Sequence, residues 1–84
     1  MRPEVTVTST DLRSYITGTL NFDLPGVTDA DPLFSSGLVD SFAMIDLIMF
    51  LETKGGFRIP PADITLDNFD TFDRIVAFMA RNAR

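Results

Sequence analysis

The chain has 84 residues, enough for one small domain whose core lies near the lower limit of independent stability. Seven Lys and Arg against twelve Asp and Glu give a net charge of −5, which repels phosphate backbones and anionic lipids and favours basic protein partners. The sequence contains no Cys and no His, which excludes disulfides, thiolate metal sites and histidine-based catalysis. We therefore expect no nucleic-acid partner, no metal ligands and no catalytic residues.

The N-terminal stretch MRPEVTVTST has no apolar signal-peptide core, and the longest apolar run lies mid-chain and is interrupted by Asp46. These features predict a soluble, cytoplasmic protein without membrane insertion, and we expect a monomer. We interpret residues 1–8 as a flexible N-terminal tail, residues 9–82 as the single domain and residues 83–84 as the C-terminal end.

The first helix is expected to open at TSTD, capped either by Thr8 together with Asp11 or by Ser9 alone. It should end before the turn signal Pro25-Gly26. Apolar residues within it recur at helical spacing and predict one buried stripe, made of Leu12, Tyr15, Ile16 and Leu20.

A connection of about twenty residues then runs from Asn21 to Asp40, far beyond the usual median of ~4 to 6. Long loops of this kind hold a particular shape when their own side chains anchor them. The candidate anchors to the core are Phe22, Leu24, Val27, Leu33, Phe34 and Leu38.

The carboxylates in TDADPLFSSGLVD raise the question of a calcium loop. Asp29 and Asp31 suit the first two ligand positions, but Leu33, Phe34 and Asp40 then occupy positions that require an oxygen ligand, Gly and Glu. We reject calcium binding and expect a solvated acidic pair, able to dock Arg side chains of a partner.

The second helix should run from Ser41 to Lys54 and stop at Gly55-Gly56, where the left-handed conformation costs little. Its core face is predicted to contain Met44, Leu47, Ile48 and Leu51. Phe42 and Met49 fall nearly opposite that face, and Ile45 lies between. Either the long loop or a third helix covers these apolar side chains, or they form a face on which a partner docks.

After FRIPP, whose prolines block a helix, we expect a short helical turn within residues 62–69. A last helix follows the capping pair Asp70-Thr71, with Arg81 and Arg84 near its C-terminus. Its apolar face should comprise Phe72, Ile75, Val76 and Met79. The sum is an all-α fold: a small bundle of three main helices plus a short extra helix, with a long loop between the first and second helices.

Ser41 stands where the polar loop meets the apolar second helix. A serine nucleophile needs a base, and the sequence offers neither a His nor a Gly-x-Ser-x-Gly elbow. Ser41 is therefore not expected to catalyse a reaction. Two interpretations stay open: Asp40 or Ser41 simply caps the helix, or Ser41 is a serine that another enzyme reaches and modifies.

The stretch DPLFSSGLVDSFAMIDLIMFLE resembles the modification site of acyl and aminoacyl carrier proteins, which bear a phosphopantetheine arm on the serine of an Asp-Ser pair. The downstream NFDTFDRIVAFM is similar to the last helix of the same family, so the resemblance covers most of residues 9–82, the expected carrier domain. Further residues at the family's spacing are Asp31, Leu33, Phe34, Gly37 and Glu52.

The resemblance implies that a phosphopantetheinyl transferase moves the arm from coenzyme A to Ser41, with Asp40 helping to present it. It also places Phe42, Ile45 and Met49 at the family's apolar partner-contact positions. An ATP-dependent amino acid or acyl ligase would load the arm with a thioester, and a downstream enzyme would use the cargo. A protein of this kind is not itself an enzyme.

Within the family, the motifs SGLVDSF and DNFDTF look most like stand-alone D-alanyl and other aminoacyl carriers. Fatty-acid carriers usually place acidic residues directly after the modified serine and its apolar neighbour, where Ala43 and Met44 stand here. Peptide-synthetase carriers more often have Gly-His-Ser or Gly-Gly-Ser-Ser-like sequences, which are also missing. The alternative function is a non-modified helical interaction module that uses the apolar outer face of the second helix.

Overall fold

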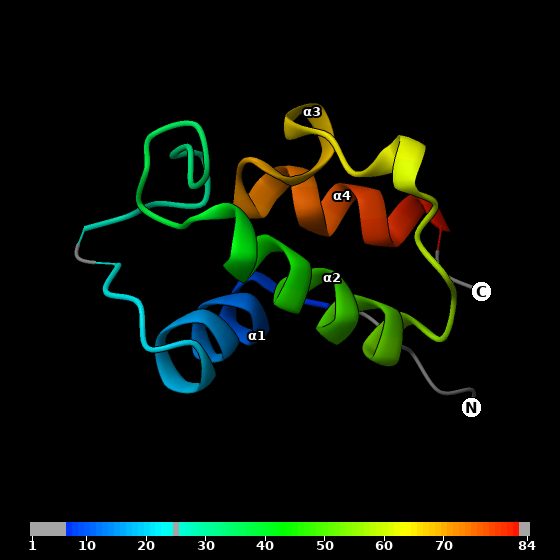
Figure 1. The fold of residues 1–84 in the computed structure, drawn as a ribbon, viewed down its shortest axis with the longest axis horizontal. Coiled ribbons are helices and arrows are strands. Elements are labelled where there is room, and N and C mark those ends of the chain that lie inside the picture. The colour runs from blue at the N-terminus through cyan, green and yellow to red at the C-terminus, as the bar shows by residue number, and fades with distance from the viewer. Residues whose placement is uncertain (1–6, 25, 83–84) are drawn as a thin grey trace.

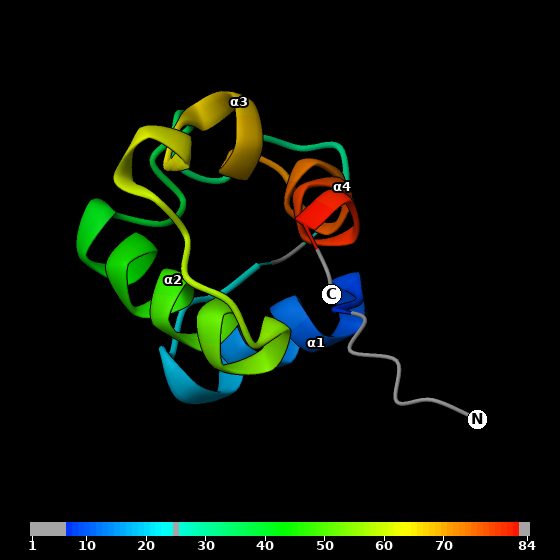
Figure 2. The same cartoon turned by 90° about the vertical axis from the view of Figure 1, so that its right-hand side faces the viewer.

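The computed structural model describes residues 7–24 and 26–82, and within them every regular element is helical. Seen from the end in Figure 2, the helices surround a common centre. Figure 1 shows the course of the chain through α-helices, a π-helix and a 3-10 helix. In chain order the elements are α1 (Ser9–Ser14), the π-helical η1 (Tyr15–Thr19), α2 (Ser41–Gly55), the 3-10 helix η2 (Pro61–Asp63), α3 (Leu66–Phe69) and α4 (Phe72–Asn82). The expected small all-α fold with a long loop before α2 is confirmed.

Helix α1 begins with a complete capping box. The Thr8 hydroxyl accepts a hydrogen bond from the Asp11 N–H at 3.2 Å, and the Asp11 carboxylate accepts one from the Thr8 N–H at 3.1 Å. Of the two caps considered, Thr8 with Asp11 is therefore the one used. Val7, within the expected tail, is buried in the core, while residues 1–6 lie outside the described residues.

Helix α1 continues directly into the π-helix η1, which ends at Thr19. Asn21 follows with a φ of 63°, a left-handed conformation that Asn tolerates better than most residues. The expected stripe is confirmed in its centre, because Leu12 and Ile16 are fully buried. Tyr15 and Leu20 are partly buried against the same core.

The long loop is anchored by its own apolar side chains, as expected, with one exception. Leu33 is fully buried, and the partly buried anchors that pack on the core are Phe22, Leu24, Val27 and Phe34. Leu38, however, is 38% exposed, and the prediction that it anchors the loop is wrong. Val39 is buried instead, because its N–H donates to the Leu33 carbonyl and turns this residue inward.

Helix α2 runs one residue further than expected, to Gly55, and Gly56 then takes the left-handed conformation with a φ of 71°. A Cβ on Gly55 would lie 2.7 Å from side-chain atoms of both Met79 and Phe57, so a larger residue here would force these side chains to shift. The buried side of the helix comprises Ala43, Leu47, Ile48 and Leu51, with Met44 partly buried.

The segment between α2 and α4 forms two short elements, η2 and α3, where one helical turn was expected. Pro61 begins η2, a position that proline tolerates because no helical partner needs its missing N–H. The start of α4 also differs from the expectation. The Thr71 hydroxyl alone accepts from the Arg74 N–H, at 3.0 Å, while the Asp70 side chain turns away to the loop.

The predicted apolar face of α4 is confirmed by the burial of Phe72, Ile75 and Met79, and Val76 is partly buried. Phe78 is also buried, with its ring 5.0 Å from that of Phe69. Arg81 lies in the last turn, and Arg84 is outside the described residues. None of the helices formed by residues 7–24 and 26–82 is long and apolar enough to cross a membrane.

Candidate functional site

Ser41 is the first residue of α2, and its side chain is exposed. The cap before it is Asp40, whose carboxylate accepts a hydrogen bond from the Ala43 N–H at 2.8 Å. The question of which residue caps the helix is thus decided in favour of Asp40. In the described part of the chain the Ser41 hydroxyl forms no hydrogen bond, so modification of this oxygen would break no contact that stabilises the fold.

The position of Ser41 suits a phosphodiester. The N–H groups in the first turn of a helix point out of its N-terminus, and the helix dipole adds partial positive charge there. Both effects favour a phosphate group bonded to Ser41, although the nearby Asp40 carboxylate works in the opposite direction. The exposed hydroxyl and the helix N-terminus therefore fit the attachment end of a phosphopantetheine arm.

Three apolar side chains of α2 that follow Ser41 point into solvent: Phe42 is 80% exposed, and Ile45 and Met49 are each 59% exposed. We call these three residues the outer face of α2. No segment within the described residues covers them, so the interpretation that the loop or another helix buries them is wrong. At about 100° per residue, Ser41 and all three lie within one exposed arc of the helix.

A buried carboxylate at the start of α4 holds the loop that leads to Ser41. Asp70 Oδ1 accepts from the N–H groups of Phe34 at 2.8 Å and Ser35 at 3.0 Å, and Oδ2 accepts from the Ser35 hydroxyl at 2.6 Å. The Asp70 carbonyl also accepts from the Leu33 N–H. Burial opposes ionisation, but these hydrogen bonds outweigh it and hold the pKa of Asp70 below its ordinary value.

Sequence reasoning missed this contact because an Asp before a Thr at a helix start is typical of a cap. The only signals in the sequence were the polar Ser35 in an otherwise anchored loop and the presence of two candidate caps, Asp70 and Thr71, where one is enough. Neither signal shows that these two parts of the chain meet.

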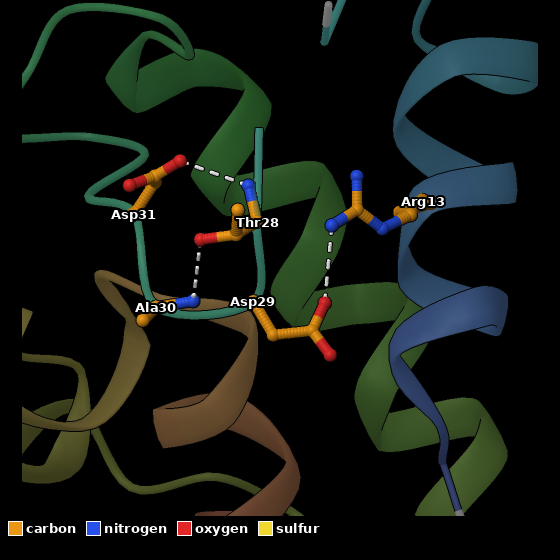
Figure 3. A network of polar contacts seen from close by, with 5 residues as sticks. All are labelled: Arg13, Thr28, Asp29, Ala30 and Asp31. Atoms are coloured by element: carbon orange, nitrogen blue, oxygen red, sulfur yellow. Dashed lines mark hydrogen bonds and ion pairs between the residues drawn. The ribbon is translucent and has the colours of Figure 1, made fainter. Parts of the chain in front are cut away.

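The acidic pair of the loop also has a structural role, shown in Figure 3. Asp29 pairs with Arg13 of α1 at 3.1 Å, and Asp31 accepts from the Thr28 N–H at 2.8 Å. The expectation of a solvated pair able to dock a partner's Arg is therefore wrong for Asp29, because an Arg of the same chain already occupies it. The Arg13 guanidinium also lies 4.8 Å from the centre of the Phe72 ring.

Comparison with known proteins identifies the family to which the chain belongs. The family model described as the phosphopantetheine attachment site matches residues 10–79, and the chain belongs to this family of phosphopantetheine-binding carrier proteins. It is thus a carrier with a covalently attached phosphopantetheine as its cofactor, and it is not an enzyme. The resemblance found in the sequence is confirmed.

Several proteins to which the chain is similar are D-alanyl carrier proteins. The chain is 32% identical over 71 residues to a D-alanyl carrier protein of Leuconostoc mesenteroides, a match that covers 80% of this chain and 90% of the relative. It is 33% identical over 54 residues to D-alanyl carrier proteins of Streptococcus thermophilus and Streptococcus gordonii, covering 64% of this chain and 67% of each relative.

Proposed function

We propose that Ser41 bears the phosphopantetheine arm and that residues 9–82 form a discrete carrier that holds an aminoacyl or acyl group on it as a thioester. One observation carries this proposal: at the start of α2 the cap is Asp40, while the hydroxyl of the neighbouring Ser41 is exposed. Because Asp40 already caps the helix, capping does not explain the serine at position 41.

Attachment of the arm is a phosphoryl-transfer reaction catalysed by a phosphopantetheinyl transferase. The Ser41 oxygen attacks the phosphorus of coenzyme A that bears the pantetheine, a phosphodiester bond forms, and adenosine bisphosphate leaves with the electrons of the broken phosphoanhydride bond. The hydroxyl proton passes to a base of the transferase. The role of Asp40 is to fix the backbone of Ser41 at the helix N-terminus.

The outer face of α2 and Asp40 are proposed as the partner-binding surface. Exposed apolar side chains gain most when a partner removes them from water at the centre of an interface. The partners are the transferase, an ATP-dependent amino acid or acyl ligase and a downstream enzyme that uses the cargo. Because coenzyme A and ATP are required, we place the protein in the cytoplasm, and we expect it to act as a monomer.

The proposed cargo is an aminoacyl group. The D-alanyl carrier relatives support this choice, as does the low acidity of α2. Asp46 and Glu52 are the acidic residues of that helix, and Glu52 is engaged, because its carboxylate accepts from the Ile59 N–H at 2.8 Å. A tethered thioester raises the local concentration of the cargo at each partner's active site without releasing it to bulk solvent.

Intact mass spectrometry tests the attachment. Incubation with coenzyme A and a broad-range transferase should add one phosphopantetheine, and peptide mapping should place it on Ser41 and on none of the other serines. The variant Ser41→Ala is the matched control and should gain no mass. A modification elsewhere, or none, contradicts the proposal, and an unmodified chain that still binds partners would favour the interaction-module alternative.

A further inference from the structure

An open groove of about 380 Å³ lies at the C-terminal end of α2, on the side of the molecule that carries the outer face. Met49, which is the last residue of the outer face, forms one edge of this groove. The complete lining is Met49, Glu52, Thr53, Gly56, Phe57 and Arg58.

The groove lies in line with Ser41. At about 100° per residue, Ser41, Met49, Glu52 and Thr53 fall within one arc of roughly 120° on α2. With a rise of 1.5 Å per residue, Met49 is about 12 Å and Thr53 about 18 Å along the helix from Ser41. Standard bond lengths give an extended phosphopantetheine a reach of roughly 18 Å, so an arm laid along the outer face ends in this groove.

We propose that this groove receives the thioester end of the arm together with a small, ammonium-bearing cargo. The inference rests on the proposed attachment at Ser41 and adds a docking site on the carrier itself. A second groove of about 260 Å³ is lined by α1 and η1 on one side and by Phe50 and Lys54 of α2 on the other. These two α2 residues lie on the opposite side of the helix from Ser41.

The chemistry of the lining matches both parts of this ligand. Met49 and Phe57 offer apolar contact to the methylene groups and the sulfur of the arm. The Thr53 hydroxyl donates to the Met49 carbonyl at 3.0 Å, which leaves its oxygen able to accept a hydrogen bond.

Charge at the groove favours a cation. The negative end of the α2 dipole lies here, and the Glu52 side chain is 26% exposed. Its Oε2 is bonded to the Ile59 N–H, while Arg58 approaches no closer than 3.9 Å with a side chain that is 94% exposed. Because the Arg58 side chain is almost fully exposed and 3.9 Å away, this ion pair is weak, so the Glu52 carboxylate can attract the ammonium group of an aminoacyl thioester.

Amide and methyl NMR spectra of the apo and holo protein test the docking of the arm. The holo form should shift the Gly56 and Phe57 amides and the Met49 methyl group, and leave the Tyr15 and Lys54 amides of the second groove unchanged. A confirmed mass gain with shifts confined to the neighbours of Ser41 overturns this inference alone. Absence of any mass gain overturns the proposed attachment, and this inference falls with it.

A pair of matched variants separates the groove from general effects of the arm. Thr53→Gln places a longer side chain in the groove at an exposed position where Gln favours the helix, and Thr19→Gln makes the same change in the second groove. The difference in shift between apo and holo forms at Gly56 and Phe57 should fall by at least half in Thr53→Gln and persist in Thr19→Gln. Equal retention in both variants overturns the proposal.

The ammonium part of the proposal is tested by comparing D-alanyl-loaded with propionyl-loaded protein, which differ only in the amino group of the cargo. D-alanyl loading should produce the larger shifts at Gly56 and Arg58. Glu52→Gln should abolish that excess, since it keeps an oxygen for the Ile59 N–H but removes the charge. Equal shifts with both cargoes, or an excess that survives Glu52→Gln, overturn the role assigned to Glu52.

Discussion

Ser35 and Asp70, thirty-five residues apart in the sequence, are joined by two hydrogen bonds: the Ser35 hydroxyl donates to Oδ2 at 2.6 Å and its N–H donates to Oδ1 at 3.0 Å. This contact ties the loop before α2 to the start of α4, close to the core residue Leu33. Because the loop leads directly to Ser41, one buried carboxylate helps to fix the approach to the candidate modification site.

Replacement of Asp70 by Asn should therefore destabilise the protein. The amide oxygen can still accept from the Phe34 and Ser35 N–H groups, but the negative charge is lost and the Ser35 hydroxyl must turn to accept from the new NH₂ group. We therefore expect the free energy of unfolding to fall by about 1–3 kcal/mol. Asp23→Asn, at an exposed loop position, is the control and should change it by less than about 0.5 kcal/mol. Urea unfolding of both variants measures the difference, and similar values for the two would contradict the role of Asp70.

The lowered pKa of Asp70 predicts a specific loss of stability in acid. A carboxyl whose pKa is lower in the folded than in the unfolded protein stabilises the fold fully above its unfolded pKa, about 3.9. That contribution is lost as the pH falls through the lowered folded-state value. Urea midpoints measured from pH 6 downward should thus decline below about pH 4, and the decline should be shallower in Asp70→Asn. An identical acid profile in the variant would show that other groups cause it.

Because Asp40 caps α2 and Ser41 is the proposed attachment site, substitution of Asp40 should lower stability and substitution of Ser41 should prevent modification. Asp40→Ala removes the cap and should cost about 0.5–2 kcal/mol of stability. Ser41→Ala should change stability by less than about 0.5 kcal/mol and abolish the mass gain with coenzyme A. Thermal melts and intact masses of both variants are the measurements. A melt of Ser41→Ala as low as that of Asp40→Ala would mean that Ser41 supports the helix after all.

Substitutions on the two sides of α2 should separate binding from folding. Leu47→Ala and Leu51→Ala remove fully buried side chains and should each cost ~2–5 kcal/mol through lost burial and cavity formation. Phe42→Ala and Met49→Glu change exposed residues and should leave the fold nearly as stable while weakening use by partner enzymes. Met49→Glu should have the larger effect on partners, because a charge then enters an interface that must lose its water.

Thermal melts and transferase kinetics on these same four variants show which residues of α2 support folding and which support partner binding. An early melt for Met49→Glu, equal to that of Leu51→Ala, would show that Met49 supports the core. Unchanged kinetics for both outer-face variants would mean that the transferase binds elsewhere.

Cargo selectivity gives a further prediction. The holo protein should accept an amino acid from an ATP-dependent ligase more readily than a long fatty acyl chain, since α2 lacks acidic side chains at Ala43 and Met44 and the relatives are D-alanyl carriers. Side-by-side loading assays with the two kinds of ligase, followed by intact mass, measure the preference. Efficient fatty acylation without aminoacylation by a ligase encoded nearby would reverse the proposed subclass.

Much of the fold was predictable because helix signals are local. The capping box at Thr8, which was one of two caps considered, the apolar spacing on α4 and the left-handed glycine that ends α2 each act within a few residues. The structure shows the box and the apolar face of α4, and it places the end of α2 one residue later than expected. The outward position of Phe42 and Met49 follows in the same way from helical periodicity. The prediction that Ser41 is modified came from resemblance to a family, since a lone serine at a helix start has no chemistry that identifies it.

By itself, then, the sequence determined the helices, their buried sides and the family, because periodicity and caps depend on residues close together in the chain. Only the tertiary structure decided that Asp70 bonds Ser35, that Asp29 pairs with Arg13, that Val39 is buried in place of Leu38 and that Glu52 is bonded to the Ile59 N–H. The physical reason is that a carboxylate can cap a helix, pair with a cation or hold a loop, and the choice among these depends on which donors packing brings within about 3 Å.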